Sequence, residues 1–77
     1  MSVTIYSTPT CPFCKQTKAY LKEHNMEFTD IDVMSNQEKA SEMIHKSGQM
    51  GVPVIDIDGE IVVGFDQKKL AELLKIQ

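Results

Sequence analysis

Two cysteines, Cys11 and Cys14, stand two residues apart at the point where a β-type run ends and a helical pattern begins. The run is Val3–Ser7. The helical pattern covers residues 12–24 and contains no glycine, and its proline, Pro12, suits the first helical position, where a missing N–H costs nothing. The chain has no other cysteine, so this junction predicts a redox pair with one sulfur at a helix N-terminus and the other one turn further in.

Further elements follow from the pattern of apolar and turn residues. Residues 27–33 are rich in β-forming side chains and predict a second strand. Ser35 and Glu38 match a capping box at the start of a helix, and Gly48 is a natural end for that helix. Residues 53–57 then predict a third strand, which begins with a proline.

The last part of the chain predicts a hairpin followed by a helix. Asp58 and Gly59 separate two β-branched runs, a pattern typical of a tight hairpin turn that leads into a strand at residues 60–63. Asp66 is expected to cap the final helix. The buried face of that helix is expected to consist of three leucines: Leu70, Leu73 and Leu74.

The order of the elements is therefore βαβαββα. Because a helix connects the first two strands, we expect them to be parallel, with the closing hairpin adding antiparallel strands. The expected fold is of the α/β class, a four-stranded mixed sheet flanked by three helices. Seventy-seven residues support one modest core, so residues 1–77 are interpreted as a single domain.

Composition excludes several classes of function. The formal charge is −3 and no run of lysine or arginine occurs, which argues against nucleic acid as a partner. Apolar runs such as residues 61–63 are far too short to cross a membrane, and the N-terminus lacks the basic and apolar regions of a signal peptide. We therefore expect a cytoplasmic protein that acts as a monomer.

The position of the two sulfurs predicts how they divide the chemistry. Cys11 should cap the first helix, where free N–H groups and the helix dipole stabilise a thiolate, the nucleophilic form of cysteine. Lys15, one turn along, is a minor contributor. Cys11 would attack a substrate disulfide, and Cys14 would then attack Cys11 and release the reduced substrate.

Two other interpretations of the cysteine pair remain open. A structural disulfide across so short a loop would remove little chain entropy, and a reducing cytosol disfavours it. A metal site would need more ligands, because the pair supplies half of a tetrahedral set and His24 and His45 are isolated. An iron–sulfur or metal site would therefore need two chains or an added thiol.

A second constellation is Gly51-Val52-Pro53, where a proline stands at the start of a strand although it cannot donate to the sheet. A cis bond before Pro53 could present the backbone of Val52 to an extended peptide, which would pair with it like an added strand. An ordinary proline in an edge strand is the alternative that the residues leave open.

Together these residues resemble the glutaredoxins of the thioredoxin-fold superfamily. Cys11-Pro12-Phe13-Cys14 resembles the family's dithiol motif, Val52-Pro53 its cis-proline loop, and Gly64 with Asp66 part of its downstream glycine–aspartate pattern. The resemblance covers essentially the whole chain and implies a thioredoxin-like fold and a thiol–disulfide oxidoreductase. Such an enzyme is an electron carrier in cell redox homeostasis that reduces protein disulfides or glutathione mixed disulfides.

The resemblance also implies a substrate site. Glutathione would lie across Phe13, pair with Val52 and meet residues 64–66, where the Asp66 carboxylate and the N–H groups of the last helix could hold its charged ends. Thr10 could donate to the Cys11 sulfur. The expected substrate-binding residues are Thr10, Pro12, Phe13, Val52, Pro53, Gly64, Phe65 and Asp66. No tightly bound cofactor is expected; glutathione would be a co-substrate.

Several positions depart from the glutathione-using pattern. Thr8 stands where such proteins commonly carry a cation, Gly51 where they carry threonine, and Val63 where they carry glycine. Loss of the cation removes a contact with a glutathione carboxylate worth about 1 kcal/mol. The run Val63-Gly64-Phe65 also resembles the NrdH-redoxins, which are reduced by thioredoxin reductase, a flavoprotein, and serve ribonucleotide reductase. That donor, an iron–sulfur carrier formed by a dimer, and a non-catalytic interaction module are the competing functions.

Overall fold

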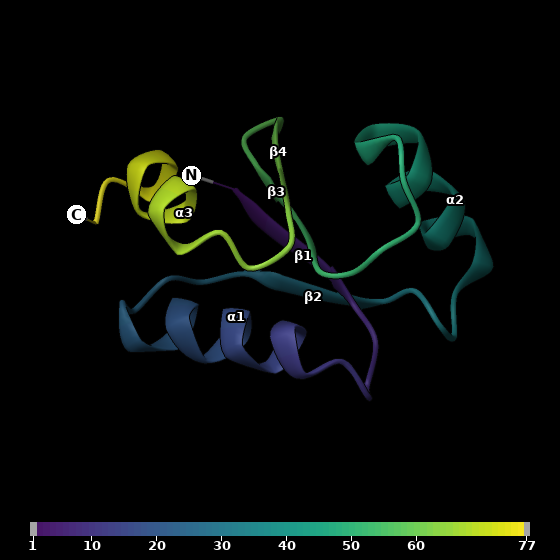
Figure 1. Cartoon of the computed structure of the whole chain (residues 1–77), viewed down its shortest axis with the longest axis horizontal. Coiled ribbons are helices and arrows are strands. Elements are labelled where there is room, and N and C mark those ends of the chain that lie inside the picture. Colours follow the sequence, from purple (N-terminus) through teal and green to yellow (C-terminus); the bar gives the residue numbers. More distant parts are fainter. Residues whose placement is uncertain (1, 77) are drawn as a thin grey trace.

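A four-stranded sheet forms the centre of the molecule in a computed structural model, which describes residues 2–76 (Figure 1). Its strands are β1 (Val3–Ser7), β2 (Thr29–Asp32), β3 (Val54–Ile57) and β4 (Glu60–Val63), in the spatial order β2-β1-β3-β4. β1 and β2 are parallel, whereas β1–β3 and β3–β4 are antiparallel. The mixed sheet expected from the sequence is confirmed.

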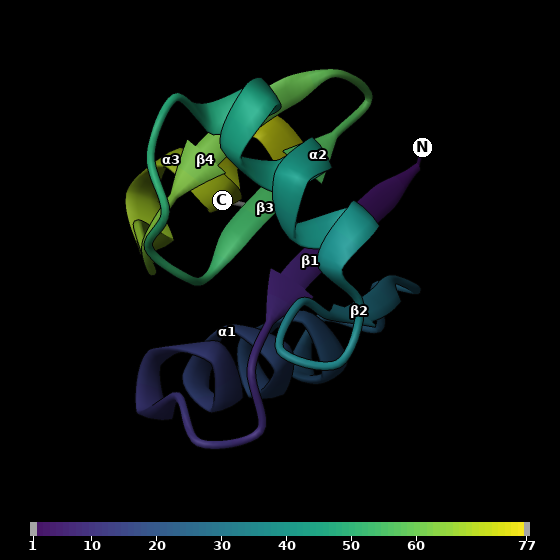
Figure 2. The ribbon, with the colours of Figure 1, turned by 90° about the vertical axis from the view of Figure 1, so that its right-hand side faces the viewer.

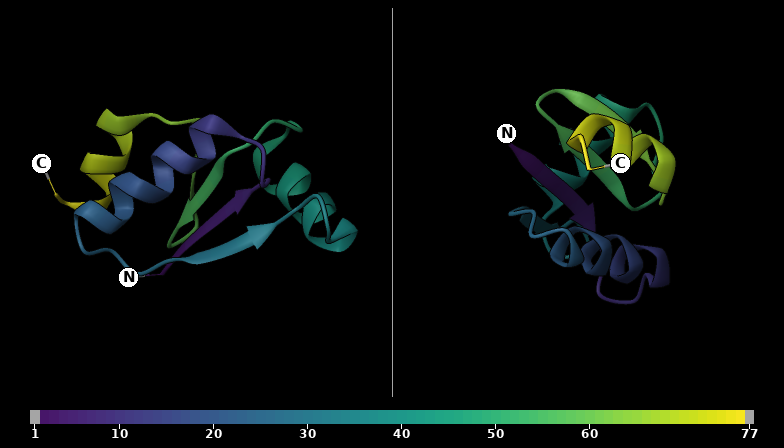
Figure 3. Two further views of the ribbon diagram at one scale, coloured as in Figure 1. Left: turned by 90° about the horizontal axis from the view of Figure 1, so that it is seen from below. Right: turned by 90° about the vertical axis from the view of Figure 1, so that its left-hand side faces the viewer.

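Three helices cover the two faces of this sheet. They are α1 (Pro12–Glu23), α2 (Gln37–Ser47) and α3 (Gln67–Leu74). Helices α1 and α3 lie on one face, and α2 lies on the other, as Figures 2 and 3 show. The chain therefore has the predicted order βαβαββα and a thioredoxin-like arrangement. No helix within residues 2–76 is long and apolar enough to cross a membrane.

Alternation along the strands divides the core between the two faces. In β1, Val3 and Ile5 pack against α1 and α3, whereas Tyr6 packs against α2. The face that carries α1 and α3 holds the larger cluster, whose buried members are Val3, Ile5, Tyr20, Leu21, Ile55, Ile57, Val62, Leu70 and Leu74. Because side chains along a strand point to opposite faces in turn, a shift of one residue in register would exchange these two sets.

The hairpin between β3 and β4 turns at the predicted pair. Asp58 and Gly59 have φ angles of 50° and 92°, as a two-residue turn with two left-handed positions requires. The Asp56 carboxylate accepts a hydrogen bond from the N–H of Gly59 at 2.8 Å, and the Ser2 carbonyl accepts one from Asp58. The turn is thus tied both to its own strand and to the start of β1.

Helix α2 begins one residue later than the capping box predicted. Asn36 is the N-cap, and its side chain accepts a hydrogen bond from the N–H of Lys39 at 3.1 Å. Ser35 instead donates to the carbonyl of Asp32, so the expected pairing of Ser35 with Glu38 is wrong. Two adjacent capping residues compete here, and the loop geometry favours the second. The end at Gly48, with φ of 74°, is as predicted.

A polar cluster joins α2 to the sheet. It adds to the apolar packing of this helix, in which Met43 is the one side chain that is fully buried. The Tyr6 hydroxyl donates to Glu42 at 2.5 Å, and the Lys46 ammonium donates to the Tyr6 oxygen at 3.0 Å and to Asp56 at 2.9 Å. Burial raises the pKa of Tyr6, and the hydrogen bond from Lys46 lowers the pKa of Asp56.

Other boundaries differ by small amounts from those expected. The second strand is shorter than the predicted residues 27–33, the third begins after Pro53 because proline has no N–H to give the sheet, and the first helix ends before its C-cap, His24. In α3, Leu70 and Leu74 are buried as predicted and Leu73 is half-buried.

Candidate active site

The loop after β1 places Cys11 at the start of α1, where it is the N-cap. Its sulfur accepts a hydrogen bond from the N–H of Cys14 at 3.2 Å, which satisfies one of the free donors of the helix's first turn. The thiol also donates to the carbonyl of Val52 at 3.8 Å. Cys11 is partly exposed, so its sulfur is reachable from solvent and lies against the backbone of the Val52 loop.

Cys14 lies one turn inside the same helix and is fully buried. Burial, followed by the hydrogen bond with Cys11, raises the pKa of the Cys14 thiol to about 12. Both cysteines are free thiols in this structure. The pair therefore combines an accessible sulfur stabilised by helix N–H groups with a hidden sulfur that holds its proton, as two consecutive thiol–disulfide exchange steps require.

The loop that faces Cys11 holds the Val52–Pro53 bond in the cis form, the first of the two alternatives that the sequence left open. The side chain of Gln49 brackets Gly51: its amide oxygen accepts from the Gly51 N–H at 2.6 Å, and its amide nitrogen donates to the Gly51 carbonyl at 3.1 Å. A Cβ atom at position 51 would lie only 2.7 Å from that amide oxygen. Gln49 thus occupies the space that a larger residue 51 would need, and sequence reasoning missed this contact.

Residues 64–66 continue the same wall of the site. The N–H of Gly64 donates to the carbonyl of Pro53 at 2.8 Å, with Gly64 at a φ of 80°, and this bond joins the segment to the loop beside Cys11. The Asp66 carboxylate caps α3 by accepting from the N–H of Lys69 at 3.1 Å. Phe65 turns inward and packs edge-on against Tyr20, with 5.8 Å between ring centroids, so it is less open to a ligand than expected.

The remaining expected site residues lie in the loop and first turn around Cys11. Phe13 is 59% exposed and stands between the two cysteines in the first turn. Thr10 and Pro12 are also exposed. The hydrogen bonds described for the Cys11 sulfur go to Cys14 and Val52, so the donor suggested at Thr10 is not among them.

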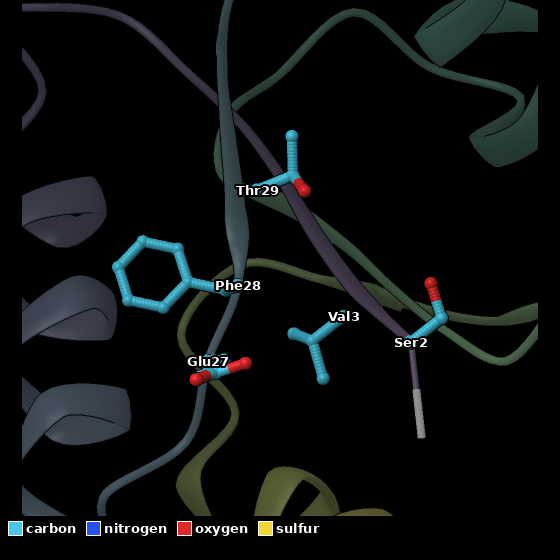
Figure 4. A pocket seen from close by; sticks show the side chains of 5 residues that line it. All are labelled: Ser2, Val3, Glu27, Phe28 and Thr29. Atoms are coloured by element: carbon cyan, nitrogen blue, oxygen red, sulfur yellow. The ribbon is translucent and has the colours of Figure 1, made fainter.

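A hollow elsewhere on the molecule is not part of this constellation. It is lined by five residues at the start of β1 and in and before β2, namely Ser2, Val3, Glu27, Phe28 and Thr29 (Figure 4). The cysteines follow the opposite, carboxyl end of β1, so the hollow lies at the far end of the sheet. Within residues 2–76, no group of three His, Cys, Asp or Glu side chains could hold a metal ion.

Comparison with known proteins agrees with this geometry. The sequence profile of the Glutaredoxin family matches residues 3–62. The chain belongs to the glutaredoxin family. An uncharacterized glutaredoxin-like 8.6 kDa protein in a rubredoxin operon of Clostridium pasteurianum is 49% identical to this glutaredoxin, over 95% of this chain and 97% of the relative. Glutaredoxin 3 of Escherichia coli is 38% identical, with 84% of this chain and 78% of the relative covered.

Glutaredoxin-like NrdH proteins are also similar to this glutaredoxin. The one from Lactococcus lactis is 35% identical, over 92% of this chain and 97% of its own. Among solved structures, a mutant of the thioredoxin-like protein BC3987 has a TM-score of 0.93 at 32% identity and covers 99% of this chain and 97% of its own. NrdH-redoxin of Escherichia coli has a TM-score of 0.80 at 25% identity and covers 100% of this chain and 96% of its own. The glutaredoxin described here is therefore a thiol–disulfide oxidoreductase.

Proposed function

We propose that this glutaredoxin reduces disulfides in other proteins through a two-cysteine mechanism. The Cys11 thiolate attacks one sulfur of the substrate disulfide, forms a mixed disulfide and releases the other substrate sulfur as a thiolate that takes up a proton. Cys14 then loses its proton and attacks the Cys11 sulfur, which forms the Cys11–Cys14 disulfide and releases the second substrate thiolate. The substrate gains two electrons, and the protein is left oxidised.

The observation that carries this proposal is the contrast between the two sulfurs. Cys11 is reachable and is held by the N–H of Cys14, whereas Cys14 is fully buried with a pKa near 12. A buried thiol does not react with a large substrate directly, but it is well placed to attack a neighbouring sulfur in the same helix turn. The two roles follow from position rather than from residue type.

The Val52 loop supports a peptide-like substrate. In the free protein the Cys11 thiol meets the carbonyl of Val52, so an extended chain that brings a disulfide to Cys11 passes directly along this loop. Backbone hydrogen bonds between such a chain and Val52 would align the disulfide without any requirement on the substrate's side chains. Gly64 borders the same loop, because its N–H donates to the carbonyl of Pro53, and Asp66 follows at the start of α3.

Exposed apolar side chains favour a protein partner. Phe13, Met34, Met50 and Val63 are 49–77% exposed, and we call them the apolar rim. The strand register places them at one end of the sheet. Ser7 at the end of β1 pairs with Asp32 at the end of β2, and Val54 at the start of β3 pairs with Tyr6 of β1 and with Val63 at the end of β4. Exposed apolar groups around a reactive sulfur are typical of a surface that contacts other proteins.

Two residues at the same end of the molecule favour one class of electron donor. A cation is absent at Thr8, and glycine is replaced by Val63, which is half-exposed; both changes weaken a site for the charged tripeptide glutathione and favour an apolar protein surface. We therefore propose a flavoprotein disulfide reductase as donor, with glutathione as the competing co-substrate. We further propose that the protein acts as a monomer in the cytoplasm, as an electron carrier in redox homeostasis.

A donor comparison tests this proposal. The oxidised protein would be given NADPH with either a thioredoxin-reductase-type flavoprotein or glutathione plus glutathione reductase, and the loss of NADPH absorbance followed with insulin as the disulfide substrate. Turnover through the flavoprotein is expected. Turnover through glutathione alone would show that Thr8 and Val63 do not prevent its use, and would overturn the donor assignment while leaving the oxidoreductase function intact.

Cysteine variants test the two roles separately. Cys11→Ser should abolish disulfide reduction, and Cys14→Ser should leave the first step intact and trap the protein in a mixed disulfide with its substrate. The trapped complex is read by mass spectrometry and disappears on addition of dithiothreitol. Full turnover by the Cys11 variant would refute the assignment of the nucleophile.

A further inference from the structure

A partly buried polar cluster lies on the α1 side of the sheet, the side that also carries Cys14. The hydroxyl of Ser7 donates to one carboxylate oxygen of Asp30 at 2.7 Å, and the ammonium of Lys18 meets the other oxygen at 2.7 Å. Ser7 is the last residue of β1 and is almost fully buried, and Asp30 lies on the adjacent strand β2. We call these three residues the Lys18–Asp30–Ser7 cluster. Neither the dithiol motif nor the order of the strands and helices predicts it.

Helix geometry places Lys18 on the same face of α1 as Cys14. Lys18 follows Cys14 by four residues in α1, and side chains four apart are neighbours on one face of a helix. The Lys18 side chain is only 24% exposed, so its ammonium is kept close to the protein by the ion pair rather than extended into water. Lys18 is therefore a fixed positive charge on the same face as the buried sulfur.

The resolving step needs such a charge. Cys14 must become a thiolate before it can attack Cys11, and burial opposes this by raising the pKa of its thiol. The other groups that act on this thiol are the Cys11 sulfur, which also raises its pKa, the backbone of Thr8, and Lys18. Among these, the Thr8 backbone and Lys18 favour the ionised form; the effect of Lys18 on the protonated free protein is the smallest of the set, but Lys18 is the one that carries a charge.

Resting on the proposed dithiol function, we propose that Lys18, held in place by Asp30 and Ser7, is a positioning residue that stabilises the Cys14 thiolate during the resolving step. Asp30 and Ser7 keep the ammonium on the Cys14 face of α1. An exposed ion pair between a helix and a strand contributes about 0–1 kcal/mol to stability, so a purely structural role for this cluster would be small.

The size of the effect follows from the linkage between basicity and rate. A nearby opposite charge lowers a pKa by about 1–3 units, and about one unit suits a lysine shared with Asp30 and with solvent. Loss of one unit reduces the thiolate fraction about tenfold, but the more basic thiolate is about threefold more nucleophilic. We therefore expect the resolving step to slow about threefold when Lys18 is neutralised, with no change in the attack by Cys11.

Stopped-flow reaction with the aromatic disulfide dithiobis(nitrobenzoate) separates the two steps. Attack by Cys11 releases one coloured thiolate at a rate proportional to reagent concentration, and attack by Cys14 on Cys11 releases the second at a rate independent of it. Lys18→Met is expected to slow the second phase about threefold and leave the first unchanged. Lys18→Arg should restore the second phase, because arginine keeps the charge and can still pair with Asp30.

Lys22→Met is the matched control. It removes the same charge from the same helix one turn further from Cys14, at an exposed position, and should change neither phase. An unchanged second phase in Lys18→Met, an equal loss in both phases, or a failure of Lys18→Arg to restore the rate would overturn the inference. A wild-type protein that shows no second phase at all would instead overturn the dithiol function on which the inference rests.

Discussion

The most direct test of the site is selective alkylation of its two cysteines. Iodoacetamide reacts with thiolates, and the structure both buries Cys14 and raises the pKa of its thiol. Cys11 is partly exposed and lies at a helix N-terminus, whereas Cys14 is fully buried. We expect the reduced, folded protein to take up one adduct, at Cys11, before any appears at Cys14.

The magnitude for Cys14 follows from its raised pKa of about 12. An ordinary cysteine has a pKa of about 8.5, so at about pH 7.5 the thiolate fraction of Cys14 is lower by about 3,000-fold. The more basic thiolate regains about 40-fold through its higher nucleophilicity, for a Brønsted slope of about 0.45. The net result is a reaction about 80-fold slower than that of an ordinary thiol, before burial of the sulfur slows it further.

The assay measures adduct formation by mass spectrometry of peptides after quenching at several times. The matched control is the same protein unfolded in guanidinium chloride, where Cys14 should react like an ordinary cysteine. The ratio of the unfolded to the folded rate at Cys14 is therefore the quantity of interest. A ratio below about 10 would refute the reasoning, because neither the burial nor the raised pKa of Cys14 would then describe the protein in solution.

Three further predictions concern the surroundings of the site. Lys46→Met should lower the free energy of unfolding by about 1 kcal/mol. Because the hydrogen bond from Lys46 lowers the pKa of Asp56, this contribution is present above about pH 4 and is lost as the pH falls through the folded-state pKa of Asp56. The difference in melting temperature between the variant and the wild type should therefore shrink in acid. Gln49→Ala should leave alkylation of the nucleophilic cysteine unchanged but slow insulin reduction, because the loop at Gly51 loses two hydrogen bonds. Asp66→Ala removes the cap of α3 and should cost about 1 kcal/mol in urea unfolding, with equal stability contradicting the cap.

Local signals in the sequence predicted most of the fold. The cap at Cys11, the turn at Asp58-Gly59, the cap at Asp66 and the end at Gly48 each depend on a few neighbouring residues, and each is present as predicted. The error at α2 has the same local origin, because adjacent capping residues offer two starting points and the pattern alone does not decide between them. Local chemistry thus fixes which elements form, with an uncertainty of about one or two residues at their ends.

The contacts that the sequence did not predict join residues far apart in the chain. Lys18 meets Asp30 and Lys46 meets Asp56 across different elements. Such pairs depend on the register of the sheet and on where each helix docks, and neither is encoded by spacing along the chain. The hydrogen bonds between the Gln49 side chain and the Gly51 backbone are local, but they depend on a side-chain conformation that no motif specifies.

The close approach of Gln49 to Gly51 makes these two positions interdependent. Gly51 does not have a positive φ, so its backbone alone would accept a threonine, the residue that glutathione users carry there. The obstacle is the Gln49 amide oxygen, 2.7 Å from where a Cβ atom would lie. Gly51→Thr should therefore displace the flexible end of the Gln49 side chain and remove the two hydrogen bonds that it makes with Gly51. A larger residue at position 51 would thus alter this loop in the same way as Gln49→Ala does, through the loss of the Gln49 hydrogen bonds, and the two substitutions together should cost little more than either one alone.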